Sequence, residues 1–219
     1  MLDLGGTLLL EVSHEVEAVS SRIAEAAGLG DLVYDKVFKL FGLRSDVCES
    51  SLDAAAYYYV AALGRGRVDA AVLEGVRREL AKALIRSFTP APAAVDVLEE
   101  LRGWGARLGV ISNASSHTVV EEVLKWHGLI KFLDVVVTSE LVGVRKPDPR
   151  IFMYALALMQ ADPGRAVYVG DKSYEDVVGA KRAGMAAIHL ARREPPSPLA
   201  DAWISELSEL PQTLKNLLD

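Results

Sequence analysis

The sequence predicts an α/β protein whose core is a Rossmann-like parallel sheet, interrupted by an all-helical insertion. Between residues 92 and 219, short apolar strands alternate with helical segments of about ten residues, which is typical of a parallel sheet with right-handed crossovers. Between residues 11 and 88, helical periodicity continues without any strand pattern. The predicted domains are therefore an α/β core of residues 1–10 plus 92–219 and a helical cap of residues 11–91.

The insertion contains four stretches in which apolar residues recur at three- and four-residue steps. These predicted helices cover residues 11–28, 32–43, 52–63 and 70–86. The following Thr89-Pro90-Ala91-Pro92 breaks the helical pattern and predicts a linker back to the core. Because the insertion leaves the core directly after the first strand, we expect it to cover that end of the sheet as a lid.

The second part of the core alternates strands and helices in order. The predicted strands cover residues 107–112, 133–138, 166–169, 186–190 and, as a short last strand, 202–204. The predicted helices cover residues 95–102, 118–127, 149–160, 176–183 and 208–218. The strands are almost wholly apolar, as expected of a parallel sheet that is covered on both faces.

Composition limits the classes of partner. The chain has 219 residues, of which 51% are hydrophobic and 25% charged, so it is long enough and apolar enough to form a globular core. Its net charge of −6, with scattered basic residues, argues against nucleic-acid and membrane partners. The single cysteine, Cys48, cannot form an internal disulfide, which fits a reducing cytoplasm. We therefore expect a cytoplasmic protein that acts on a small molecule, with a homodimer left open.

Polar residues gather where the predicted strands end, which is where ligands bind in open α/β sheets. They are Asp3, Gly5 and Thr7 after the first strand, Ser112 and Asn113 after the second, Lys146 in the loop after the third, and Asp171 to Asp176 after the fourth. Two acidic strand ends predict an oxygen site suited to Mg²⁺. A carboxylate beside such an ion can attack phosphorus and form an aspartyl-phosphate. Hydroxyl, amide and lysine groups can hold the phosphoryl oxygens.

Four segments resemble, in order, the four motifs of the haloacid dehalogenase (HAD) superfamily, most of whose members are Mg²⁺-dependent phosphatases. They are Asp3-Leu4-Gly5-Gly6-Thr7-Leu8, Val110-Ile111-Ser112-Asn113, Lys146-Pro147-Asp148-Pro149, and Val169-Gly170-Asp171 with Asp176 beyond it. The helical insertion between the first and second motifs resembles the C1 cap of this family. The resemblance therefore covers the whole core and implies the HAD fold.

The resemblance also implies a nucleophile and a metal site. Asp3 would be the nucleophile and the first Mg²⁺ ligand. The backbone carbonyl of Gly5 would be a second ligand and Asp171 a third, while Asp176 would bind the ion directly or through water. The implied activity is hydrolysis of a small phosphorylated metabolite through an aspartyl-phosphate at Asp3.

A second group of residues would hold the phosphate. By the same resemblance, Ser112, Asn113 and Lys146 would bind the phosphoryl oxygens, and Lys146 would also orient Asp3. Thr7 would brace the phosphate-binding loop. Asp3, Lys146 and Ser112 would thus form the catalytic set.

Gly5 departs from the family pattern, because phosphatases of the family carry there a second aspartate that protonates the leaving group and later activates water. General acid–base help of this kind is worth roughly 10²–10⁴-fold. Three hypotheses stay open. The chain hydrolyses phosphates with good leaving groups, with His14, Glu11 or Glu15 as candidate proton donors from the cap. Alternatively, it is a weakened or non-catalytic relative that binds phosphate or a protein, or it cleaves a carbon–phosphorus or carbon–halogen bond.

A second departure lies before the nucleophile, where only Met1 and Leu2 precede Asp3. The family has a longer buried strand there, and each lost side chain would remove about 1.5–3 kcal/mol of burial. We therefore expect the natural start to lie upstream of Met1. Among the other polar residues, we expect Glu175 to be exposed and His189 to be structural.

Overall fold

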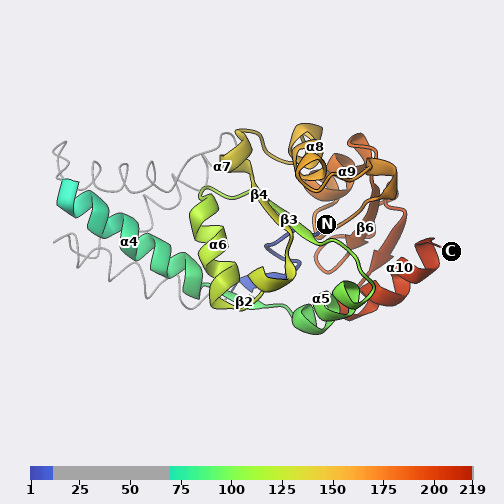
Figure 1. Cartoon of the computed structure of the whole chain (residues 1–219), viewed down its shortest axis with the longest axis horizontal. Coiled ribbons are helices and arrows are strands. Elements are labelled where there is room, and N and C mark those ends of the chain that lie inside the picture. Colours follow the sequence, from blue (N-terminus) through green and yellow to red (C-terminus); the bar gives the residue numbers. More distant parts are fainter. Residues whose placement is uncertain (12–69, 219) are drawn as a thin grey trace.

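The structure, a computed structural model, describes residues 1–11 and 70–218 (Figure 1). The helices predicted over residues 11–28, 32–43 and 52–63 lie outside these residues, apart from Glu11. The fourth is present with the predicted bounds as α4 (Ala70–Arg86). Figure 1 shows α4 extending away from the sheet, with one end beside α6 (His117–Trp126).

The predicted parallel sheet is confirmed, and Leu2 lies at its centre. One pair of strands and one group of three lie on either side of Leu2. They are β3 (Gly109–Ser112) with β4 (Val135–Thr138), and β5 (Val167–Gly170) with β6 (Ala186–Leu190) and β7 (Ala202–Ile204). Leu2 forms parallel bridges to Val110 of β3 and to Val169 of β5. The spatial order is therefore β4, β3, Leu2, β5, β6, β7, with all strand ends pointing the same way.

Helices cover both faces of this sheet (Figure 1). One face packs against α5 (Ala94–Gly103), α6 and α10 (Leu210–Leu218), and the other against α8 (Pro149–Leu158) and α9 (Gly179–Arg182). The shorter helical segments are α7 (Ser139–Val142), η1 (Ile130–Phe132), η2 (Pro163–Arg165) and η4 (Leu207–Glu209).

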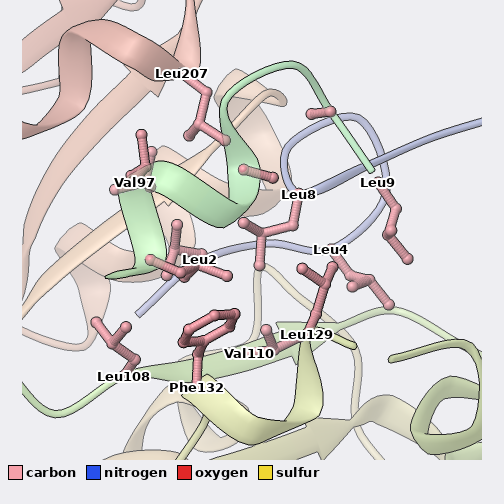
Figure 2. Packing of buried hydrophobic residues seen from close by; sticks show 14 of the residues in the cluster. Leu2, Leu4, Leu8, Leu9, Val97, Leu108, Val110, Leu129, Phe132 and Leu207 are labelled. Carbon is pink, nitrogen blue, oxygen red and sulfur yellow. The ribbon is translucent and has the colours of Figure 1, made fainter. Parts of the chain in front are cut away.

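The two hydrophobic layers follow the alternation of side chains along the strands. Val110 and Val169 belong to the layer beneath α5 and α6, whereas their neighbours Ile111 and Tyr168 belong to the layer beneath α8. Figure 2 shows Leu2 among the buried residues of the first layer. Each such aliphatic side chain stabilises the fold by about 1.5–3 kcal/mol. Leu2 thus joins the two halves of the sheet through both its backbone and its side chain.

The predicted linker over residues 89–92 is wrong at its first two positions, because Thr89 and Pro90 belong to a strand. β2 (Phe88–Pro90) pairs antiparallel with β1 (Leu9–Glu11), in a register that places Leu9 opposite Pro90. Proline is tolerated in an edge strand, where its missing N–H costs no ladder bond. The two chain crossings between the core and the insertion are therefore tied together.

The helix predicted over residues 176–183 begins earlier than expected. It starts as a π-helical segment, η3 (Ser173–Val178), and continues as α9. Within the described residues, no helix is both long and apolar enough to cross a membrane.

Candidate active site

The loop after Leu2 carries Asp3 to the carboxyl end of the sheet. The Asp3 N–H donates to the carbonyl of Val169 (2.8 Å), which continues the pairing with β5 up to the residue that bears the carboxylate. Gly6 has a φ of +88°, and a Cβ there would lie 2.2 Å from Oδ2 of Asp171. Only glycine combines this backbone conformation with so close an approach. The glycine thus lets the first loop and the Asp171 loop meet.

Lys146 is the centre of the buried floor of the site. Its Nζ donates to Oδ1 of Asp3 (2.5 Å) and to Oδ1 of Asp176 (2.7 Å). It also lies 3.0 Å from the Tyr168 hydroxyl and 3.1 Å from the Ile111 carbonyl oxygen. The Tyr168 hydroxyl in turn donates to the Ile111 carbonyl (3.0 Å). We call Lys146, Asp3, Asp176 and Tyr168 the floor of the site.

Electrostatics within the floor keep Lys146 charged. Burial alone would lower the pKa of the Lys146 ammonium, but the carboxylates of Asp176 and Asp3 hold that pKa well above its ordinary value. Burial raises the pKa of Asp3 to about 7; Lys146 opposes this rise, and the charge of Asp176 adds to it. The lysine therefore offsets only part of the local negative charge.

Three carboxylates of this site are arranged to hold a cation. Asp3, Asp171 and Asp176 each offer an oxygen within 4.8 Å of the others, and all three are buried. Oδ1 of Asp171 is buried without a hydrogen-bond partner among the described residues, and burial followed by the charge of Asp176 raises the pKa of Asp171. With all three ionised, they exceed the single lysine by two negative charges. A divalent, oxygen-seeking cation such as Mg²⁺ therefore fits this donor set.

Asp176 differs from the other two carboxylates because both of its oxygens already accept hydrogen bonds. Oδ1 accepts from Lys146, and Oδ2 accepts from the Lys172 N–H (2.9 Å). Of the two roles predicted for Asp176, a contact to the ion through water agrees better with this bonding.

Asn113 fixes the loop that carries Lys146. Its Oδ1 accepts from the Lys146 N–H (2.8 Å), and its Nδ2 donates to the Lys146 carbonyl (3.1 Å) and to Oε2 of Glu175 (3.0 Å). Both polar atoms of the Asn113 side chain are thus bonded within the protein. The predicted contact with the phosphate would therefore be made by the backbone N–H of Asn113. Glu175, expected to be exposed, is instead half-buried and also accepts from Lys172 Nζ (3.1 Å).

The remaining predicted residues lie at the same end of the sheet. Ser112 is the buried last residue of β3. Thr7 is fully buried, but its hydroxyl has no hydrogen-bond partner within residues 1–11 and 70–218, so its bracing role stays a prediction. Gly5 is exposed, and a Cβ built on it would meet no described heavy atom within 4 Å. The position of the family's acid is therefore empty space in the described part of the chain.

Comparison with known proteins identifies the family of the chain. The sequence profile of the haloacid dehalogenase-like hydrolases matches residues 1–190. The chain belongs to this family. Among HAD structures, a phosphatase from Thermococcus onnurineus is 28% identical and superposes with a TM-score of 0.70, covering 97% of this chain and 95% of that one. A haloacid dehalogenase from Pseudomonas syringae, 24% identical with a TM-score of 0.76, covers 98% and 96% and shows the shared fold.

Two curated HAD relatives are named as a nucleotidase and a phosphatase. The pyrimidine 5'-nucleotidase YjjG of Escherichia coli is 39% identical over 137 residues, which is 60% of each chain. A glyceraldehyde 3-phosphate phosphatase of Methanothermobacter thermautotrophicus is 45% identical over 106 residues, or 48% of this chain and 45% of the relative. The chain thus matches about half the length of these relatives.

Two residues of the HAD core support the site without having been singled out as functional in the sequence. Tyr168 contacts Lys146 as described above, and its ring packs edge-on against Phe152 at 4.9 Å between centroids. His189, expected to be structural, is fully buried and has its Nε2 3.2 Å from the Asp171 carbonyl. Its Nδ1 accepts from the Ser197 N–H (3.0 Å), so the proton is on Nε2 and is donated to Asp171. His189 therefore holds the loop of a metal-ligand candidate.

Proposed function

We propose that this chain is a Mg²⁺-dependent phosphatase that acts on a small phosphorylated metabolite through an aspartyl-phosphate at Asp3. The observation that carries the proposal is the cluster of Asp3, Asp171 and Asp176 at the carboxyl end of the sheet, where Lys146 forms ion pairs with Asp3 and Asp176. The names of two relatives, a pyrimidine 5'-nucleotidase and a glyceraldehyde 3-phosphate phosphatase, support the same activity, although the chain matches only about half of their length.

The proposed reaction has two steps at Asp3. A carboxylate oxygen of Asp3 attacks phosphorus, and the bond from phosphorus to the leaving oxygen breaks with its electron pair passing to that oxygen. Water then attacks the phosphorus of the aspartyl-phosphate, which releases inorganic phosphate and regenerates the carboxylate. Throughout, Lys146 would orient Asp3, and Ser112 with the backbone of Asn113 would hold the phosphoryl oxygens.

The carboxylates of Asp3 and Asp171, with the backbone carbonyl of Gly5, would hold the Mg²⁺ ion, and Asp176 would contact it through water. When bound, the ion would neutralise charge on the phosphoryl oxygens and on the attacking carboxylate. The unpartnered oxygen of Asp171 supports this assignment.

Gly5 narrows the class of substrate in this proposal. Without a carboxylic acid there, the leaving oxygen has no proton donor among the described residues of the first loop. Substrates whose leaving group is stable as an anion, such as acyl and aryl phosphates, need this proton least. We therefore propose that these are the better substrates. The C1 type of the helical cap and the cytoplasmic location are proposed on the sequence alone.

The test is the hydrolysis of p-nitrophenyl phosphate with Mg²⁺ and with the metal removed by a chelator. We expect turnover that requires Mg²⁺ and is lost in Asp3→Asn. Asp96→Asn, an exposed position on α5, is the matched control and should behave as the wild type. Turnover that survives either the chelator or Asp3→Asn would contradict the proposal.

A second candidate, favoured by the empty space at Gly5, is a relative that binds phosphate or a protein without turning substrate over. Because no described atom crowds that position, Gly5→Asp can be accommodated and discriminates the two. An inert wild type together with an active Gly5→Asp variant would establish a disarmed site. Cleavage of carbon–halogen or carbon–phosphorus bonds is the third candidate, and it requires turnover of haloacids or phosphonates.

A further inference from the structure

A pocket of about 310 Å³ opens beside the metal-site candidate Asp171 and the nucleophile loop at Gly6. Leu10 and Pro92, at the two crossings between core and insertion, form its apolar wall. Its opposite side is formed by Arg192, Arg193 and Glu206, which follow β6 and β7. We call this the arginine pocket. Its size lies at the lower end of the range for small-molecule sites, which is roughly 300–1,000 Å³.

The two arginines of the arginine pocket are in different situations. Arg192 is largely covered and forms an ion pair with Glu206, with 3.3 Å between Nη2 and Oε2. Arg193 is exposed, and within the described ranges its guanidinium forms no ion pair. Arg193 is therefore a cation beside the site that is available to a ligand.

The backbone on either side of Arg193 is held to the core. The Ala191 N–H donates to the Ile204 carbonyl (2.8 Å), and the Arg192 N–H donates to the Leu190 carbonyl (2.9 Å). On the other side, the Glu194 carboxylate accepts from the Ser173 N–H (2.9 Å), at the start of the segment that leads to Asp176. The guanidinium is thus carried by a tethered segment, and less entropy is lost when it binds an anion.

We propose that Arg193 binds a second anionic group of the substrate, a carboxylate or a second phosphate, while the phosphoryl group being transferred lies at Asp3. The proposal rests on the phosphatase function and adds a substrate class to it: small metabolite phosphates with a further anionic group. Asp171 and Glu206 also line the pocket, but Glu206 is paired with Arg192 and Asp171 belongs to the proposed metal site, so among the described lining residues Arg193 is the cation that remains for such a group. A guanidinium binds both carboxylates and phosphates through paired N–H groups.

The experiment compares substrates that differ in the second anion only. Because alkyl phosphates lack the good leaving group that this site needs, the pairs are aryl phosphates. 3-Carboxyphenyl phosphate is paired with 3-carbamoylphenyl phosphate for the carboxylate arm, and resorcinol bisphosphate with 3-methoxyphenyl phosphate for the phosphate arm. In at least one arm, we expect wild-type kcat/KM to be about tenfold higher for the substrate that carries the additional anionic group. The arm that shows this preference identifies the anion. Arg193→Gln should reduce that ratio to within about twofold, mainly through KM, and Arg193→Lys should restore part of it.

Arg165→Gln is the matched control, because it removes an exposed arginine from the segment that precedes β5, at the opposite end of the strand from the site. It should leave the ratio unchanged. Equal kcat/KM values within both wild-type pairs would overturn the proposal. So would an Arg193→Gln variant that slows both members of a pair equally, since Arg193 would then contact the common phosphoryl group.

Binding of non-hydrolysable probes separates this proposal from the phosphatase function. With Mg²⁺ present, calorimetry should show phosphonoacetate binding about tenfold more tightly than ethylphosphonate, and Arg193→Gln should remove the difference. If no phosphate ester is turned over but this preference is found, the phosphatase proposal fails and the arginine pocket stands. If the second anion is a phosphate, propane-1,3-bisphosphonate should instead bind about tenfold more tightly than propylphosphonate. Equal affinities within both pairs overturn the arginine pocket whatever the turnover.

Discussion

Asp3 belongs to the floor of the site, and Gly5 lies only two residues further along the same loop. The two positions nevertheless differ in the contacts that surround them. On the floor, Lys146 contacts two carboxylates, a phenol and a carbonyl through buried hydrogen bonds of 2.5–3.1 Å. At Gly5, a side chain would meet no described atom. The residues proposed to bind and attack a phosphoryl group are therefore held in place, whereas the described residues of the first loop offer no group to donate a proton to the leaving oxygen.

This contrast teaches that the two halves of phosphatase chemistry can be separated in one loop. Stabilising the charge of a phosphoryl group requires groups that are buried and held in place, because their effect is largest where water is excluded. Proton transfer to the leaving group requires a single titratable side chain at the surface of the loop. Without the proton donor, the fold and the floor stay intact, but the leaving group of the substrate must then be stable as an anion.

Breaking the floor should have the largest effect. Lys146→Met removes the one cation between Asp3 and Asp176 and leaves two buried carboxylates facing each other. We expect the free energy of unfolding to fall by about 3–5 kcal/mol and kcat for p-nitrophenyl phosphate to fall by about 10²–10³-fold. Urea denaturation and steady-state kinetics measure the two effects. Lys125→Met, an exposed lysine of α6, should change the free energy of unfolding by less than about 0.5 kcal/mol.

Removing one hydroxyl from the floor should have an intermediate effect. Tyr168→Phe keeps the ring that packs on Phe152 but leaves the Lys146 ammonium and the Ile111 carbonyl each short of one partner. We expect a loss of about 1–3 kcal/mol in stability and a lower kcat with little change in KM, because Lys146 would be less well oriented. Tyr154→Phe, on the exposed side of α8, should leave both quantities unchanged. Wild-type kcat in Tyr168→Phe would contradict a role for the Tyr168 hydroxyl in orienting Lys146.

Weakening the contacts that hold the Lys146 loop from outside the floor should lower stability and kcat by less. Glu175→Gln weakens the contact with Asn113, which fixes the Lys146 loop, and removes the ion pair with Lys172. We expect about 1 kcal/mol of lost stability and a fall in kcat that is smaller than for Tyr168→Phe. Lys172→Gln is the control that breaks only the ion pair, and it should cost less than about 1 kcal/mol because that pair is half-exposed. Equal effects of the two variants would contradict a role for the Asn113–Glu175 contact.

The smallest effect is expected beside Lys146 but outside the floor. Asp148 caps α8 and pairs with Arg150, whose hydrogen bonds lower the pKa of Asp148 to about 2. A depressed carboxylate pKa stabilises the fold above the ordinary value, and that contribution is lost as the pH falls from about 4 towards 2. Asp148→Ala should cost about 1 kcal/mol near neutral pH. Both variants remove the charge, but Asp148→Asn keeps the cap, so urea denaturation of this variant should show only the part of the loss that disappears as the pH falls from about 4 towards 2.

The sequence predicted those parts of the site that follow from strand ends. Asp3, Ser112 and Asp171 stand at or just after the end of an apolar run, and Lys146 lies in the loop after another, so parallel strands bring these positions together. Asp176 was predicted as well, and the structure adds that both of its oxygens are already bonded. The order of the strands on either side of Leu2 could not be predicted in this way, because it depends on pairing between segments that are far apart in the sequence.

Other parts needed contacts between distant segments. Tyr168 lies in an apolar strand, where an aromatic residue indicates only strand propensity; its role depends on the register that sets its hydroxyl against Ile111 of β3. Glu175 reads as a solvated residue until η3 places it against Asn113. Arg193 lies in a charged, proline-rich loop, and its place beside Asp171 depends on how that loop returns to the core.

The central claim is that the floor holds the groups needed to attack a phosphoryl group, and that the general acid of the family is missing at position 5. It is tested most directly by the dependence of kcat/KM on the pKa of the leaving group, from aryl to alkyl phosphates, in the wild type and in Gly5→Asp. We predict a steep fall towards alkyl phosphates in the wild type. In Gly5→Asp we predict a much flatter dependence, with alkyl phosphates gaining about 10²–10⁴-fold and p-nitrophenyl phosphate gaining little. A flat wild-type dependence, or a Gly5→Asp variant that changes all substrates alike, would contradict the claim.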